Sequence, residues 1–231
     1  VGEVDDPSAV TSRELAEMMV GSELPTPETR ESTVTDIPVL ELRDVTVANS
    51  EAGARNLLDH VTFTVHRGEI VGIAGVEGNG QSELVNAIVG LAASKGTILL
   101  DGNDIARLST RDRRGGGIGY IAEDRQKDGL VMDFSLWENA ALGHQHESPY
   151  GKGPWLNVPG AKTQTEAIVE EFDVQTPSIN VPAFTLSGGN QQKLVVGREM
   201  TADPKVLVAA HPTRGVDVGA QAGIWDILRD A

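Results

Sequence analysis

The chain has 231 residues, enough to bury a hydrophobic core in one or two domains. Its 34 acidic and 19 basic side chains give a formal net charge of −15, which argues against nucleic acid as a partner. It has no cysteine, so a disulfide framework and a thiolate metal site are both excluded.

The first segment, residues 1–37, has the composition of a tail and a linker. It holds nine acidic and two basic residues, and its second half is rich in Ser, Thr, Pro and Glu. A short helix is predicted over 13–20, capped by Thr11 or Ser12. We interpret 1–37 as the acidic tail of a preceding domain followed by a linker; a plain disordered leader is the alternative.

A folded domain is predicted from residue 38 onward. Its first strands are expected at 39–47 and 60–65, and another at 97–100. The basic cluster at 111–117 is interpreted as a solvated helix end rather than as a phosphate site.

A glycine-rich stretch, G-V-E-G-N-G-Q-S at 75–82, follows the apolar run 70–74 and precedes a helical pattern. A buried strand, a loop and a helix are the setting of a phosphate-binding loop, whose backbone N–H groups point at phosphate oxygens. The usual lysine is replaced by Gln81, which brings no positive charge, so weaker binding is expected. Ser82 keeps the hydroxyl that would hold Mg²⁺.

The middle of the chain is predicted to consist of short elements. A strand is expected at 118–121 and a helix at 134–142 with Ser135 as its cap, whereas the Gly- and Pro-rich stretch 148–160 is interpreted as a loop.

This part of the chain also contains two histidines and two aromatic residues that are candidates for a functional role. His144 and His146 show no metal-ligand spacing and are interpreted as solvated. Phe134 and Trp137 are interpreted as core residues, with a docking surface as the alternative.

The sequence L-S-G-G-N-Q-Q-K at 186–193 is the most informative motif in the chain. Ser187 is a good helix N-cap, Gly188 and Gly189 leave the backbone bare, and a helix is predicted over 191–200. A helix start with free N–H groups favours an anion such as phosphate. An ordinary Ser-Gly-Gly turn that caps a helix is the alternative.

The last part is predicted to form a strand at 206–210, the loop H-P-T-R-G-V-D at 211–217 and a helix over 220–229. This helix is amphipathic, with Ile224, Ile227 and Leu228 toward the core.

Four motifs together resemble one family, the ABC-type ATPases. They are the glycine-rich loop, L-S-G-G-N-Q-Q-K, E-D-R-Q-K-D-G-L at 123–130 and P-T-R-G-V-D-V-G-A at 212–220. The last three are similar to the second half of the tandem ATPase subunit of bacterial sugar and nucleoside importers. The resemblance implies an α/β P-loop NTPase fold over 38–231, with a mixed sheet core, an antiparallel β subdomain and a helical subdomain at about 124–190. The family continues with further strands and a switch histidine, so a C-terminally truncated domain is expected.

The resemblance also implies the roles of individual residues. ATP and Mg²⁺ are the expected cofactors, and the ATP-binding residues would be Gly75, Gly78, Asn79, Gly80, Gln81, Ser82 and Glu83. The family usually ends its Walker B strand with Asp and Glu, whereas this chain has Ala210 and His211. Glu123 stands where the family has Gln, leaving a weak Mg²⁺ site at Ser82 and Glu123. We therefore expect this half to be inactive or nearly so; a general-base role for His211 is the alternative.

Such ATPases work as head-to-tail pairs, which implies a role for this chain in a partner's site. Its signature residues Ser187, Gly188, Gly189 and Gln191 would complete the ATP site of the N-terminal half of the same subunit or of a second copy, and Asp217 would cross the interface. The implied function is that of an ATP-binding half energising uptake of a sugar or nucleoside through transmembrane permease subunits. Because no apolar run approaches the ~18 residues of a membrane span and no signal peptide opens the chain, a cytoplasmic domain at the inner face of the membrane is expected.

Two other functions remain open. One is a nucleotide-free pseudo-ATPase that acts as a structural or regulatory partner of the other half. The second is an ABC ATPase of translation or DNA repair, disfavoured because the chain lacks basic surface and a long coiled-coil insertion. A GTPase is disfavoured by the absence of an N-K-x-D motif.

Overall fold

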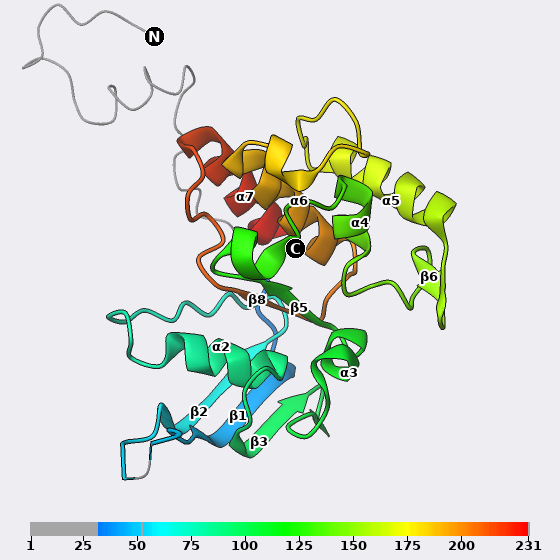
Figure 1. The fold of residues 1–231 in the computed structure, drawn as a ribbon. Helices are drawn as coiled ribbons and strands as arrows, with labels where there is room; N and C mark the ends of the chain where they lie inside the picture. Colours follow the sequence, from blue (N-terminus) through cyan, green and yellow to red (C-terminus); the bar gives the residue numbers. More distant parts are fainter. Residues whose placement is uncertain (1–31, 52, 231) are drawn as a thin grey trace, which may run out of the picture.

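The structure is a computed structural model that describes residues 32–51 and 53–230. The short helix and most of the linker predicted at the start of the chain lie outside the described residues. The rest folds as an antiparallel sheet with one helix against it, a central pair of parallel strands, and a group of helices beyond that pair (Figure 1).

The antiparallel sheet has the strand order β2-β1-β3-β4. Its strands are β1 (Pro38–Val47), β2 (Leu58–His66), β3 (Lys95–Leu100) and β4 (Asn103–Asp104). In β1, Leu40 lies opposite Leu100 of β3 and Val65 of β2, so the apolar side chains of three strands meet on one face. The strands predicted at 39–47, 60–65 and 97–100 are confirmed.

Helix α2 (Gln81–Val89) covers this sheet (Figure 1). It buries Leu84, Ala87, Ile88 and Val89, which share a core with the apolar residues of β1, β2 and β3. This core also holds Ile105 and Ile118. The sheet therefore fixes the helix that begins directly after the glycine-rich loop.

Two parallel strands connect the sheet region to the helices. Strand β5 (Ile118–Ile121) pairs with β8 (Val206–Ala209), with Gly119 opposite Leu207. A Cβ at Gly119 would lie 3.0 Å from the Leu207 side chain, so the glycine leaves room for this close contact. The preceding helix α3 (Thr110–Gly115) is capped by Ser109, whose side chain accepts from the backbone N–H of Asp112.

The remaining helices pack around a second apolar core. It is formed by residues of α4 (Leu136–Ala141), α5 (Val158–Glu171), η2 (Ala183–Thr185), α6 (Gly188–Met200) and α7 (Val218–Asp230), by residues of the loops between them and by Ile121. The short η1 (Arg125–Gly129) lies next to this core, with Gly129 close to Val195. Helix α6 is buried nearly all round, with Leu194, Val195 and Val196 fully covered. The predicted helix at 220–229 is confirmed, and Ile224, Ile227 and Leu228 reach this core.

Two sequence-based element assignments are wrong. The apolar run 70–74, expected to be a buried strand, forms no strand, and Ile70 and Ile73 are 69% and 53% exposed. Among the described residues no strand is hydrogen-bonded to it, and an isolated strand has no partner for its backbone groups. The stretch 148–160 is not all loop, because it holds the hairpin β6 (Gly151–Lys152) and β7 (Trp155–Leu156) and the first turn of α5.

Residues near α4 also depart from expectation. Helix α4 itself is confirmed, with Ser135 and Glu138 forming a capping box. Phe134 is 42% exposed rather than core, whereas Trp137 packs against the second core and lies beneath the ammonium of Lys162.

His144, expected to be solvated, is buried beside an ionic cluster. Its Nε2 lies 2.9 Å from Nη2 of Arg114, and the same guanidinium contacts the buried carboxylate of Glu199. Burial, and then the positive charge of Arg114, lower the pKa of His144 to about 4. Burial acts to raise the pKa of Glu199, but Arg198 and Arg114 outweigh it and hold that pKa below its ordinary value. The cluster therefore contains a carboxylate and a neutral imidazole.

Candidate functional site

The glycine-rich loop runs directly into the N-terminus of α2. Gly78 and Gly80 have φ values of 88° and 99°, conformations that favour glycine. Gly80 is also the N-cap residue, and a Cβ there would lie 2.9 Å from the carbonyl oxygen of Leu57. The loop therefore has the backbone form that lets N–H groups converge on an anion at a helix start.

The side chain of Gln81 folds back over this loop. Its Nε2 donates to the carbonyl oxygen of Val76 at 3.3 Å, and it lies 2.2 Å from where a Cβ of Gly75 would be. The same carbonyl accepts the backbone N–H of Asn79 at 3.1 Å. The residue in the position of the usual lysine is thus engaged with the loop itself.

The two residues after Gln81 lie in the first turn of α2. Ser82 is exposed and Glu83 is partly buried. The helix dipole favours an anion at this turn, and the exposed Ser82 places a hydroxyl there.

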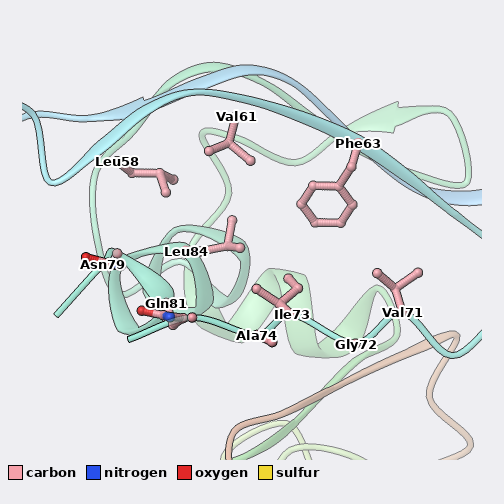
Figure 2. Close-up of a pocket in the computed structure, with 12 residues that line it drawn as sticks. Leu58, Val61, Phe63, Val71, Gly72, Ile73, Ala74, Asn79, Gln81 and Leu84 are labelled. Carbon is pink, nitrogen blue, oxygen red and sulfur yellow. The ribbon is translucent and has the colours of Figure 1, made fainter. Parts of the chain in front are cut away.

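A hollow of about 500 Å³ lies between the loop and the sheet. Figure 2 shows Leu58, Val61 and Phe63 of β2 on one side, facing Leu84 of α2 and Ile73 of the 70–74 run. Residues of the glycine-rich loop and the start of α2, namely Gly75, Asn79, Gly80 and Gln81, line its other end. The hollow is therefore apolar next to the sheet and polar next to the loop.

The signature motif begins α6. Ser187 is exposed and caps the helix, its Oγ accepting from the backbone N–H of Asn190, whose side chain also donates to it at 3.0 Å. The helix starts at Gly188, earlier than the predicted residue 191. The motif thus presents the capped start of a helix of 13 residues, with a hydroxyl at its tip.

Gln191, unlike Ser187, is buried inside the protein. Its side chain is 2% exposed; Nε2 donates to the carbonyl oxygens of Ala183 and Leu186, and Oε1 accepts from Arg125 and Gln126. The side-chain bonds of Gln191 are therefore internal, whereas the side chain of Ser187 is exposed.

The residues in the Walker B positions follow β8. Ala210 has no ligand atom, and its backbone N–H donates to the carbonyl oxygen of Ile121. His211 is exposed with a φ of 49°, so the chain turns sharply directly after the strand. A carboxylate is present at neither position.

Glu123, the predicted second Mg²⁺ ligand, pairs with Arg214 of the loop after β8. Within residues 32–51 and 53–230, no group of three His, Asp or Glu side chains is arranged to hold a metal ion. Ser82 and Glu123 alone make a poor metal site, since two side chains are few for a metal and the Glu123 carboxylate is already paired with Arg214.

Asp217 is exposed directly before α7, and its carbonyl oxygen accepts the backbone N–H of Gln221. The loop that leads to it is held against the signature helix through Arg125. Arg125 is a residue that the sequence reasoning missed, because its partners lie 66 to 90 residues away. In the described residues, no hydrogen bond or ion pair joins the glycine-rich loop to the signature motif.

The sequence matches the ABC transporter family over residues 58–214, more than half of its length. The chain belongs to the ABC transporter family. The matched region of this ABC domain contains both the glycine-rich loop and the signature motif, so the resemblance based on these motifs is confirmed.

Two relatives are each 42% identical to this ABC domain. The guanosine import ATP-binding protein NupO of Bacillus subtilis aligns over 208 residues, 90% of this chain and 40% of the relative. The glucose import ATP-binding protein TsgD13 of Haloferax volcanii aligns over 226 residues, 96% of this chain and 41% of the relative. The chain thus spans about two fifths of the length of these relatives.

Solved ABC cassettes share the fold. A dimeric ATP-binding cassette in a post-hydrolysis state, bound to ADP and Pi, superposes with a TM-score of 0.69 at 22% identity, covering 82% of this chain and 81% of the other. A nucleotide-free cassette from an ABC transporter superposes with a TM-score of 0.67 at 24% identity, covering 84% and 76%. The predicted P-loop NTPase fold of ABC-ATPase type is confirmed. No helix in the described part of the chain is long and apolar enough to cross a membrane.

Proposed function

We propose that this chain is one ATP-binding half of an importer ATPase that energises uptake of a sugar or nucleoside. The names of the relatives, guanosine import and glucose import ATP-binding proteins, support this class of substrate. Its own ATP site is degenerate, and its signature motif completes the ATP site of a partner half. We call the protein formed by this chain and its partner half the two-half subunit.

The observation that carries the proposal is the contrast between the two motifs. At the glycine-rich loop, Gln81 is hydrogen-bonded to Val76, and the acidic residues of Walker B are replaced by Ala210 and His211. The signature helix, in contrast, has a regular Ser187 cap with its hydroxyl exposed. The residues around the glycine-rich loop therefore lack the charged groups that hydrolysis needs. The signature motif has the exposed serine that a contact with the partner's ATP needs.

The residues of this half suit the phosphates of ATP better than they suit Mg²⁺. The backbone of 75–80 suits phosphate, and Ser82 supplies a hydroxyl beside it. Glu123 is paired with Arg214, and no group of three acidic or histidine side chains in the described residues could hold a metal ion, so the residues present do not form a full Mg²⁺ site. We therefore assign no hydrolytic step to this half.

The proposed partners follow from the head-to-tail arrangement. They are the N-terminal ATPase half of the same subunit, or a second copy, and transmembrane permease subunits that place the assembly at the inner face of the cell membrane. Asp217 is proposed to lie at the contact with the partner half. Ser187, Gly188 and Gly189 are proposed to face the phosphates of the partner's ATP, and Gln191 to support them from within.

The test is ATP turnover by the two-half subunit carrying Ser187→Arg. The bulky cation would block the donated contact, and removing one preorganised donor of this kind lowers turnover on the order of a hundredfold. Ser109→Arg is the matched control, because Ser109 is also an exposed N-cap serine, at α3. Turnover unchanged by Ser187→Arg would overturn the proposal.

A nucleotide-free pseudo-ATPase is the second candidate, favoured by the bond between Gln81 and Val76 and by the pairing of Glu123 with Arg214. Calorimetric titration of this chain with Mg-ATP separates the two. Clear binding would support a degenerate but occupied site, whereas no heat up to millimolar ATP, repeated in the two-half subunit, would support the pseudo-ATPase.

A further inference from the structure

Arg125 joins two segments that are distant in sequence. It is the first residue of η1 and is partly buried. Its Nη1 donates to the carbonyl oxygen of Arg214 at 2.6 Å and its Nη2 to that of Gly215 at 3.1 Å. Its Nε approaches Oε1 of Gln191 at 3.4 Å. One guanidinium therefore bridges the loop after β8 and the signature helix.

The acceptors suit an arginine better than any other side chain. Two carbonyl oxygens of adjacent residues face two nitrogens of one planar group, while a third nitrogen faces the amide oxygen of Gln191. A lysine is a point charge on a flexible stem and cannot hold this three-way arrangement. Replacing Arg125 thus removes a geometric link as well as a charge.

Gly188 is packed against the same group. A Cβ at this position would lie 2.5 Å from Nη2 of Arg125 and 2.9 Å from the carbonyl oxygen of Gly215. The first glycine of the signature motif therefore allows the guanidinium and the loop to lie directly against the start of α6. This contact gives that glycine a role within its own chain.

Two further contacts hold the same loop. Nε2 of Gln192 donates to the carbonyl oxygen of Pro212 at 2.7 Å, and Arg214 pairs with Glu123. The loop is therefore held from α6 on one side and from the 123–125 segment on the other. The three loop carbonyls that accept these bonds, those of Pro212, Arg214 and Gly215, precede Asp217 by at most five residues in the chain.

We infer that Arg125 is a positioning residue that holds the start of the signature helix and the loop leading to Asp217 as one unit. The inference rests on the proposed function, because it assigns both segments to the contact with the partner half. Arg125 itself would touch no nucleotide. It fixes the position of Ser187 relative to Asp217, and both residues are proposed to face the partner half.

The first test is hydrogen exchange in the chain itself, which does not depend on the proposed function. Arg125→Ala is expected to quicken exchange of backbone amides in 188–191 and 212–217 by at least about tenfold, since the bridge that limits local opening is gone. Arg107→Ala, at an exposed arginine before α3, is the control and should leave both segments unchanged. Unchanged exchange in Arg125→Ala would overturn the inference.

The second test is ATP turnover by the two-half subunit. Arg125→Ala is expected to lower kcat by about tenfold with little change in KM for ATP, because the nucleotide is bound mainly by the partner half. Millimolar guanidinium ion should restore part of kcat to Arg125→Ala and none to Ser187→Arg. Arg125→Lys, which keeps the charge and volume if the alanine variant folds poorly, should also lower kcat.

The outcomes distinguish failure of the positioning role of Arg125 from failure of the proposed function. A loss of turnover with Ser187→Arg but none with either Arg125 variant would overturn the positioning role and leave the proposed function standing. If Ser187→Arg also leaves turnover unchanged, the proposed function fails, and the exchange measurement alone decides whether Arg125 holds the two segments together.

Discussion

The side-chain amide of Gln81 lies 3.3 Å from the carbonyl oxygen of Val76, within the loop whose N–H groups would otherwise face a phosphate. A phosphate in this loop would meet the neutral amide of Gln81 and not the positive charge of a lysine. A neutral hydrogen bond contributes about 1 kcal/mol, against about 1.5–3 kcal/mol for a charge-assisted one. The loop is therefore expected to hold nucleotide weakly.

Gln81→Lys is predicted to tighten Mg-ATP binding by this chain by about tenfold, since it replaces a neutral donor with a cation. Hydrolysis should scarcely rise, because Ala210 and His211 supply no carboxylate. Calorimetry measures the first effect and phosphate release the second. Brisk hydrolysis in this single variant would contradict the assignment of a degenerate site.

Arg113 is predicted to be essential for the stability of the region that carries the loop. Its buried guanidinium donates to the carbonyl oxygens of Ala87 and Ile88 at the end of α2, and to those of Leu108 and Ala106. Arg113→Met keeps the apolar stem but leaves these acceptors unpaired, and is expected to cost on the order of 3 kcal/mol of unfolding free energy.

Arg111→Met is the matched control, because Arg111 lies on the same short helix but is exposed. A change within about 0.5 kcal/mol is expected there. Urea denaturation of both variants checks the difference; equal stabilities would show that the buried bonds of Arg113 contribute nothing.

His144 is predicted to make the fold less stable in mild acid. Its pKa is lowered to about 4 from the ordinary 6.5, so the unfolded chain binds a proton between these pH values and the folded chain does not. Stability attributable to this side chain is therefore complete above pH 6.5 and falls as the pH drops toward 4, by about 3 kcal/mol in all.

In His144→Gln, which cannot titrate, the loss of stability between pH 7 and pH 4.5 should be correspondingly smaller. His146→Gln is the control, since His146 is exposed, and should follow the wild type. Denaturation midpoints measured across this pH range provide the check. Parallel pH profiles for the wild type and His144→Gln would refute the buried neutral imidazole.

Elements defined by local pattern could be predicted from the sequence. The strands β1 and β3 follow from apolar and β-branched runs, and α4 from the Ser135 cap with Glu138 three residues later. The Ser187 cap of α6 was predicted for the same reason. In each case the deciding contacts lie within a few residues.

Features set by distant partners could not be predicted in this way. The run 70–74 looks like a strand by composition, but pairing depends on a neighbouring strand. His144 is buried by Arg114 and Tyr150 rather than by its own neighbours in a polar stretch. Arg113 stands in a basic cluster and Arg125 in a run of mixed charges, yet each donates to backbone carbonyls far along the chain.

The most direct measurement is ATP turnover by the two-half subunit with Ser82→Ala and, separately, with Ser187→Arg. Ser82 belongs to this chain's own loop, and Ser187 to the motif that we propose completes the partner's site. The account predicts that Ser82→Ala keeps most of the turnover, whereas Ser187→Arg loses on the order of a hundredfold. The reverse result, with turnover lost in Ser82→Ala and kept in Ser187→Arg, would show that this half hydrolyses ATP at its own site.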